Sequence, residues 1–206
     1  MQSEPPRVLY IAGYGRSGST VLDVLLGGHP QSVSVGEMTY LAQDWTLEGR
    51  RCACGKTYVR CPFWRGAFGQ GREPHRANRI TRAVEHRRSL FSLLSGGLSE
   101  SRRQVYREQM RALFAHAAQQ GDAEVVVDSS KSARHAAGRF WALREIAGLD
   151  VRVLHLVRDG RSTLRSVVEK GSNWALEGHR LEKAPLAERT ILGWSLANSI
   201  AWGLGR

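Results

Sequence analysis

The stretch GYGRSGST, residues 13–20, decides the fold, and it directly follows the apolar run of residues 8–12. A short apolar run that ends in glycine is typical of a buried parallel strand, and helical periodicity follows over residues 17–26. Strand, Gly-rich loop and helix in this order predict a P-loop, in which backbone N–H groups and the helix dipole hold an anion. The usual P-loop lysine is missing. Ser19 stands at its position, and Arg16 is the cation of the loop.

Further strands and helices alternate along the chain outward from this loop. The apolar runs 124–128 and 151–157 predict two more buried strands, and residues 32–35 alternate briefly. Helices are expected at about 76–95, 101–119, 133–147, from RDGRS to about 170, and 185–204. This order predicts an α/β domain, a P-loop-NTPase-like three-layer fold with a central parallel sheet flanked by helices. Its three strong strands end at GYGRSGST, DSSKS and RDGRS, and ligands of such sheets bind beyond the carboxyl ends of the strands.

The length of 206 residues fits a single domain, 1–206, with an irregular Cys/Arg-rich insertion at about 45–75. The spacing of Cys52, Cys54 and Cys61 differs from that of zinc knuckles. We therefore expect a packed, turn-rich insertion with free thiols and no metal, and a disulfide is the alternative. No apolar run reaches the length of a membrane span, and the start MQSEPPR does not resemble a signal peptide, so the expected compartment is the cytoplasm.

The net charge of +11 is concentrated in the middle of the chain. Residues 51–110 carry 13 Lys and Arg against four acids, whereas residues 1–50 are slightly acidic. Such an excess fits a polyanion surface or a solvated arginine-rich helix face. Because no aromatic ladder or recognition motif accompanies it, we expect no nucleic-acid partner. An anionic small molecule or an acidic glycan is compatible with it.

The loop LVRDGRSTLRS predicts a second anion site. Arg158 closes a strand, and the hydroxyls of Ser162 and Ser166 share one face of the following helix. Arg158 and Ser166 would converge on one phosphate through charge-assisted hydrogen bonds. The alternative is a helix start capped by Asp159, with solvated arginines. Two anion sites at separate strand ends fit a nucleotide that carries a 5′ group and a separate 3′-phosphate and that needs no metal.

These two motifs resemble those of the PAPS-dependent sulfotransferases, which use 3′-phosphoadenosine 5′-phosphosulfate. The family motif R/K-S-G-[ST]-[ST] matches residues 16–20, and R-D-x-R with a serine eight residues after its first arginine matches residues 158–161 and Ser166. The form RSGST…HP…GE with RDGRS resembles the carbohydrate and tyrosylprotein branches more than the cytosolic steroid and phenol branch. The resemblance implies transfer of a sulfuryl group to an acceptor hydroxyl of a glycan, peptide or small molecule.

The resemblance also implies roles for individual residues. The 5′-phosphosulfate would be bound by Ser17, Gly18, Ser19 and Thr20 with the help of Arg16, and the 3′-phosphate by Arg158 and Ser166. Glu37 would be the catalytic base, with His29 as the alternative. Lys131 would assist the leaving group. No metal takes part.

The chain also departs from the family pattern, because family members continue beyond the tryptophan-bearing helix. We therefore expect that the C-terminal part of the family domain is missing, that apolar surface is exposed and that the chain self-associates. One alternative is a P-loop kinase or NTPase in which Asp128 binds a metal ion. The others are a non-catalytic polyanion binder and a truncated, inactive relative.

Overall fold

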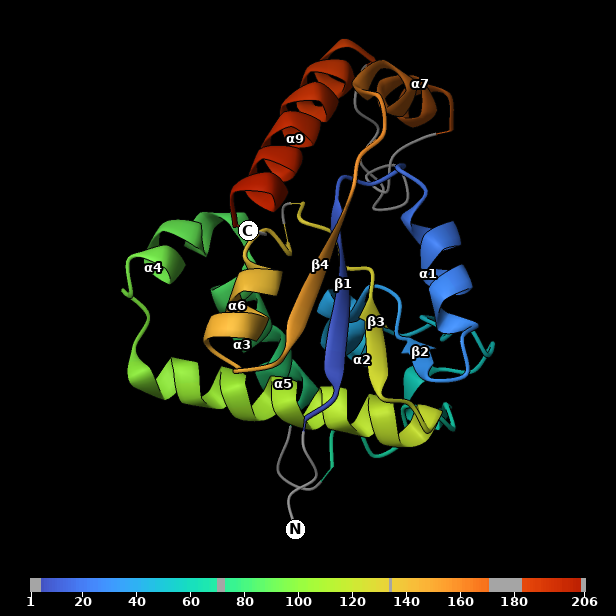
Figure 1. Ribbon diagram of the computed structural model, residues 1–206, viewed down its shortest axis with the longest axis vertical. Helices are drawn as coiled ribbons and strands as arrows, with labels where there is room; N and C mark the ends of the chain where they lie inside the picture. Colours follow the sequence, from blue (N-terminus) through green and yellow to red (C-terminus); the bar gives the residue numbers. More distant parts are fainter. Residues whose placement is uncertain (1–4, 70–72, 134, 171–182, 205–206) are drawn as a thin grey trace.

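The structure, a computed structural model, describes residues 5–69, 73–133, 135–170 and 183–204. Four parallel strands form one sheet in the order β2-β3-β1-β4, and their carboxyl ends lie at the top of Figure 1. The strands are β1 (Arg7–Gly13), β2 (Ser32–Ser34), β3 (Val125–Asp128) and β4 (Val151–Leu156). β1 lies between β3 and β4, and Val8, Tyr10 and Ile11 are fully buried. The uninterrupted apolar run of β1 is therefore that of a strand covered on both faces.

Helices cover both faces of this sheet. The path from β1 to β2 crosses the sheet in one direction, and the paths from β2 to β3 and from β3 to β4 cross it in the other. Since crossovers between parallel strands are right-handed, α1 lies on one face and α5 and α6 on the other. The predicted three-layer α/β fold is confirmed. The α-helices are α1 (Ser19–Gly27), α2 (Leu41–Thr46), α3 (Pro74–Glu85), α4 (Leu90–Leu94), α5 (Glu100–Gly121), α6 (Arg139–Glu145), α7 (Gly160–Lys170) and α9 (Lys183–Leu204).

Two predicted helices are shorter than expected. The helix predicted at 76–95 ends at Glu85, because the backbone of His86 is extended and its imidazole accepts a hydrogen bond from the N–H of Arg88 (3.0 Å). A 3₁₀ turn η3 (Arg87–Ser89) and α4 follow. The helix predicted at 133–147 spans only α6. The chain after β3 first donates backbone hydrogen bonds to neighbouring loops, so it cannot begin a helix there.

The predicted insertion between α2 and α3 is largely irregular. Its described part, residues 47–69, contains the 3₁₀ turn η2 (Tyr58–Arg60) and one isolated antiparallel bridge between Arg51 and Thr57. Cys61 and Trp64 of this segment are nevertheless buried in the main core. The insertion is therefore packed, as the sequence predicts, and it is anchored at its second half.

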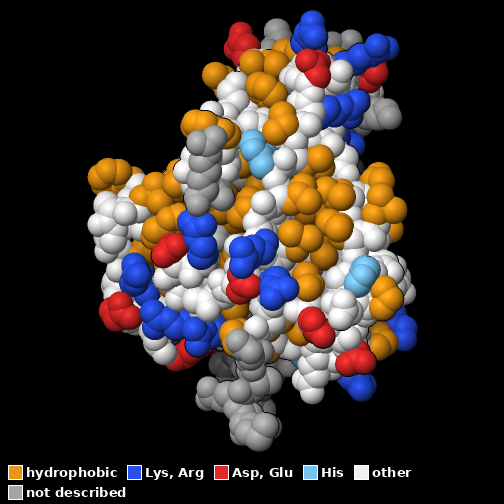
Figure 2. Space-filling model, viewed as in Figure 1, with side chains coloured by type: hydrophobic (Ala, Val, Ile, Leu, Met, Phe, Trp, Pro, Cys, Tyr) orange, Lys and Arg blue, Asp and Glu red, His pale blue; other side chains and the backbone are white. Residues whose placement is uncertain are grey.

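Apolar side chains also remain on the surface. Val21, Val24 and Leu25 of α1 are each more than three-fifths exposed, and Figure 2 shows hydrophobic side chains gathered on this face of the molecule. Within the described ranges β4 pairs only with β1 and so forms one edge of the sheet. None of the described helices combines the length and the apolar character that a membrane span requires.

Candidate functional site

The loop between β1 and α1 has the form of an anion cradle. Gly13 has a φ of 130°, and a Cβ at this position would overlap the carbonyl oxygen of Leu156 in β4, so only glycine fits. Gly18 precedes α1 with a φ of 95°, and open space lies beside it. The buried hydroxyl of Ser17 has no hydrogen-bond partner among the described residues. A buried polar group without a partner is costly, and an anion at the start of α1 would satisfy it.

The loop after β3 is bonded directly to this cradle. The N–H of Gly13 donates to the hydroxyl of Ser132 (3.0 Å), and the N–H of Ser132 donates to the carbonyl of Gly13 (3.0 Å). The same hydroxyl donates to the carbonyl of Ala197 in α9 (3.0 Å). Ser132 thus joins the first two loops and the last helix. Its role is not visible in the sequence, because it depends on contacts with residues more than 60 positions away.

The structure brings Glu37 and Lys131 together at this edge of the sheet. The amine of Lys131 forms an ion pair with the carboxylate of Glu37, and the lysine side chain is only 12% exposed. Glu37 directly precedes the 3₁₀ turn η1 (Met38–Tyr40), but its side chain makes no capping hydrogen bond there. The glutamate therefore does not cap this turn. Its carboxylate instead faces the amine of the loop that follows β3.

The third loop contacts the first. The guanidinium of Arg158 donates to the carbonyl of Arg16 (3.0 Å), and the indole N–H of Trp194 in α9 donates to the carbonyl of Arg158 (3.0 Å). Trp194 is a second supporting residue whose role the sequence does not reveal. The only signal for it was its place in the periodic pattern of the last helix. Arg158 therefore lies beside the P-loop at the same edge of the sheet.

Backbone strain is concentrated at this site. Among the described residues, three that are not glycine have a positive φ: Arg16 (66°), Lys131 (65°) and Asp122 (46°). Asp122 ends α5, where left-handed residues are common. The other two are candidate site residues. Such conformations cost of order 1–3 kcal/mol and occur preferentially in active sites and ligand clamps.

The structure does not join Ser166 to Arg158. Ser166 lies partly exposed on α7, and no side-chain hydrogen bond links the two within the described part of the chain. Asp159 accepts hydrogen bonds from the N–H of Ser162 (3.0 Å) and from Arg161 (3.4 Å), which hold its pKa below the ordinary value. The helix start capped by Asp159, which the sequence left as an alternative, is thus present. The guanidinium of Arg158 takes no part in this cap and instead contacts the P-loop at Arg16.

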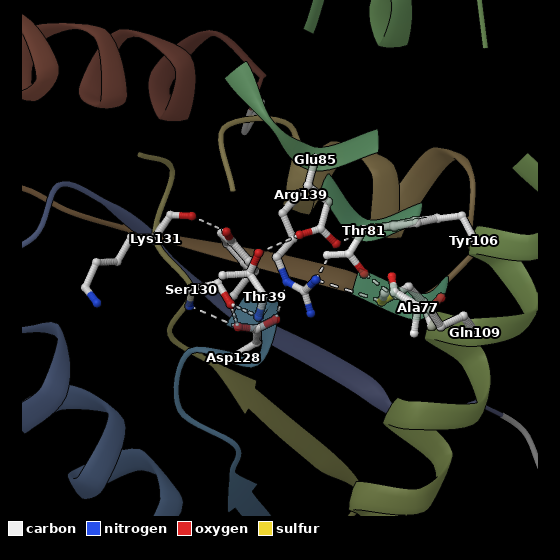
Figure 3. Close-up of polar contacts among 12 residues, drawn as sticks. Thr39, Ala77, Thr81, Glu85, Tyr106, Gln109, Asp128, Ser130, Lys131 and Arg139 are labelled. Atoms are coloured by element: carbon white, nitrogen blue, oxygen red, sulfur yellow. Dashed lines mark hydrogen bonds and ion pairs between the residues drawn. The ribbon is translucent and has the colours of Figure 1, made fainter. Parts of the chain in front are cut away.

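A buried charge network lies behind Lys131 (Figure 3). Arg139 of α6 is fully buried and forms ion pairs with Asp128 at the end of β3 (2.8 Å) and with Glu85 at the end of α3. The carboxylate of Asp128 also accepts the N–H of Ser130 (2.9 Å). The network therefore fixes the residue that precedes Lys131. In Figure 3 the lysine side chain points away from the network.

The same network reaches the segment that carries Glu37. The hydroxyl of Ser130 accepts the N–H of Thr39 (3.0 Å), and the hydroxyl of Thr39 donates to Glu85 (2.8 Å). Burial raises the pKa of Glu85, and the guanidinium of Arg139 opposes that shift. One buried positive charge thus faces two carboxylates. The segments that carry Glu37 and Lys131 are therefore both fixed by hydrogen bonds to this one cluster.

The network also bears on the kinase alternative. That alternative requires the carboxylate of Asp128 to bind a metal ion beside a nucleotide. Asp128 is fully buried, and its oxygens are taken by Arg139 and by Ser130. This carboxylate is a structural anchor and not an open metal ligand.

The remaining candidates take ordinary positions. Ser19 is buried in the first turn of α1, and Thr20 is exposed beside it. His29 is exposed, and its ring nitrogen accepts the N–H of Gln31 (3.2 Å) in the turn after α1. Its geometry is that of a turn residue.

Comparison with known families extends over most of the chain. Residues 6–191 match the model described as "Sulfotransferase family". This range includes all three loops of the site and the described insertion. No curated protein matches the sequence significantly.

Proposed function

The chain belongs to the sulfotransferase family, and we propose that it transfers a sulfuryl group from 3′-phosphoadenosine 5′-phosphosulfate to an acceptor hydroxyl. The observation that carries the proposal is the meeting of three loops at one sheet edge. Arg158 donates to the carbonyl of Arg16, and Ser132 is hydrogen-bonded to Gly13. The positive groups of these loops therefore lie close together, where a nucleotide with two separate anionic groups would bind.

The residues present fit this co-substrate. The unpartnered hydroxyl of Ser17 and the N–H groups that begin α1 would accept the 5′ end, with Ser19, Thr20 and Arg16 beside them. Arg158 would bind the 3′-phosphate from the opposite loop, and Ser166 would join it after rotation of its side chain. The nucleotide would supply the sulfuryl group and leave as the 3′,5′-bisphosphate.

Glu37 and Lys131 would handle the proton and the charge of the reaction. As the acceptor oxygen bonds to sulfur and the bond from sulfur to the phosphate oxygen breaks, the carboxylate of Glu37 takes the hydroxyl proton. The amine of Lys131 neutralises the leaving phosphate oxygen. In the described structure the amine and the carboxylate form an ion pair with each other. Binding of the nucleotide would draw the amine toward the phosphate and free the carboxylate as a base.

The proposals for the acceptor, for self-association and for the cellular compartment come from the sequence. A basic surface favours a glycan or another anionic acceptor, since Arg76, Arg79 and Arg82 of α3 are all exposed. The exposed apolar residues of α1 are compatible with self-association. The cytoplasm remains the expected compartment, and the carbohydrate or tyrosylprotein branch remains the expected relationship.

The experiment is calorimetric titration with 3′-phosphoadenosine 5′-phosphate, with and without Mg²⁺, and with ATP plus Mg²⁺ in parallel. We expect metal-independent binding of the bisphosphate that Arg158→Ala weakens by at least tenfold, because a charge-assisted contact to phosphate contributes about 1.5–3 kcal/mol. Arg161→Ala is the matched control, since Arg161 lies only three residues further on, in the first turn of α7, but is 93% exposed and pairs with Asp159.

Either of two results would overturn the proposed function. The first is preferential binding of ATP with Mg²⁺, which would restore the kinase interpretation. The second is equal weakening by both arginine variants, which would reduce the effect to general surface charge. Binding without transfer to any hydroxyl acceptor would identify the inactive relative that the sequence also allowed.

A further inference from the structure

The three cysteines of the insertion converge in space. The sulfur atoms of Cys52, Cys54 and Cys61 all lie within 4.8 Å of one another, and those of Cys54 and Cys61 are 3.6 Å apart. They are also the only cysteines of the chain. A turn centred on Gly55 supplies the first two, and the third follows η2. The sequence spacing did not predict this convergence.

The separation of the sulfurs suits a metal ion better than a disulfide. In a tetrahedral zinc site with Zn–S bonds of about 2.3 Å, neighbouring sulfurs lie about 3.8 Å apart. A disulfide requires about 2.05 Å. The 3.6 Å between Cys54 and Cys61 is close to the former value and far from the latter. All three thiols are free in the structure.

Backbone N–H groups point at two of the three sulfurs. The N–H of Cys54 points at the sulfur of Cys52, and the N–H of Lys56 points at the sulfur of Cys54. Hydrogen bonds from the backbone to metal-bound thiolates are the usual outer-shell support of such sites.

Surrounding charge complements the site. Three thiolates and one divalent ion leave a net charge of −1, and the exposed cations Arg51, Lys56 and Arg60 lie in the same short segment. Arg51 also spans the turn, donating to the carbonyl of Gly55 (2.8 Å). The negatively charged metal cluster would thus be a local partner for the positive charge of the insertion. No nucleic acid is needed to explain that charge.

Regular secondary structure contributes little to the order of this segment. Residues 47–69 contain one 3₁₀ turn and one isolated bridge, and structureless segments of this length are uncommon inside compact domains. Cys61 is fully buried in the core, whereas Cys54 is exposed. An ion bound by both would link the exposed turn to the core. Metal binding that orders a segment in this way contributes directly to folding.

We propose that Cys52, Cys54 and Cys61 bind one Zn²⁺ as thiolates, with a water molecule as the fourth ligand, and that the ion fixes the insertion to the core. On binding, each ionising thiol gives its proton to solvent. Across the described ranges no fourth His, Cys, Asp or Glu joins the cluster, so the fourth position is assigned to solvent on the side of the exposed Cys54. The proposal does not depend on the transferase reaction.

The test is metal analysis of the full chain purified without chelator from zinc-supplemented cells. We expect about one zinc per chain and, after replacement by Co²⁺, the sulfur-to-cobalt charge-transfer absorption of a tetrahedral thiolate site. Cys54→Ser should lower affinity for Zn²⁺ by more than the 10- to 100-fold that loss of an outer-shell partner causes. Lys56→Gln is the control, because it changes the neighbouring charge but keeps the backbone N–H and all three sulfurs.

Several results would overturn the proposal. They are wild-type protein without zinc and without the cobalt absorption, unchanged affinity in Cys54→Ser, or a mass lower by two hydrogens, which reveals a disulfide. Should Cys54→Ser fail to fold, the cobalt titration of the wild type decides alone. Chelation should also lower the melting temperature of the wild type. A melting temperature that chelator leaves unchanged contradicts the structural role.

Discussion

Replacing Arg139 by methionine tests whether the buried network holds the site together. Arg139 is fully buried and is the counter-charge of both Glu85 and Asp128. Methionine fills a similar volume but carries no charge, so both carboxylates lose their counter-charge. Removing one partner of a buried ion pair costs about 3–5 kcal/mol. With a typical urea dependence of about 2 kcal/mol per molar, the unfolding midpoint should fall by about 1.5–2.5 M.

The assay is urea unfolding followed by the fluorescence of the six tryptophans. Arg144→Met is the control on the same helix, because its pair with Glu145 is partly exposed and should contribute at most about 1 kcal/mol. Adding Glu85→Gln and Asp128→Asn to Arg139→Met should recover much of the loss, since neutral groups need no counter-charge. A midpoint for Arg139→Met within the range of the control would refute the reasoning.

Three further predictions concern two residues of the site and Asp23, a buried residue of α1 that accepts a hydrogen bond from Ser34 (2.6 Å). Glu37→Gln should lower the transfer rate by 10²- to 10⁴-fold without weakening binding of 3′-phosphoadenosine 5′-phosphate, as expected for loss of a base; parallel loss of binding would contradict this role. Gly13→Ala should lower the yield of folded protein or its melting temperature, because the new methyl group meets the carbonyl of Leu156; an unchanged melting curve would contradict the tight approach. Burial raises the pKa of Asp23, so its stabilising effect is complete below the unfolded pKa of about 3.9 and is lost as pH rises through the folded pKa. Asp23→Asn should therefore flatten the fall in stability with rising pH seen for the wild type, and identical pH profiles in urea unfolding would disprove the assignment.

Local patterns were sufficient for the strands and the P-loop. The apolar run of β1 and the glycines after it carry their own signal, because a buried parallel strand and a left-handed turn constrain adjacent residues. The helix break at His86 was missed. There an imidazole accepts a backbone hydrogen bond in competition with the helix, and hydrophobic periodicity does not register such a contact.

The supporting residues of the site could not be predicted from local patterns. Arg139 is one of 26 arginines, and nothing in its neighbourhood distinguishes it from a solvated one. Its burial arises only when α6, β3 and α3 pack together. Lys131 and Glu37 were named from a family resemblance, but their direct pairing joins residues 94 apart in the chain. Long-range contacts of this kind have no signature within a short window of sequence.

The pairing of β1 sets a condition on synthesis of the protein. Arg7 is aligned with Val125 of β3, and Val8 with Val151 of β4, so neither neighbour exists until about 120–150 further residues have been made. At 5–20 residues per second the nascent apolar strand waits roughly 6–30 s for its partners. During that interval it is a candidate for chaperone binding at the ribosome. Synonymous changes that slow translation between β1 and β3 should lengthen this exposure and increase aggregation, although the finished polypeptide is identical.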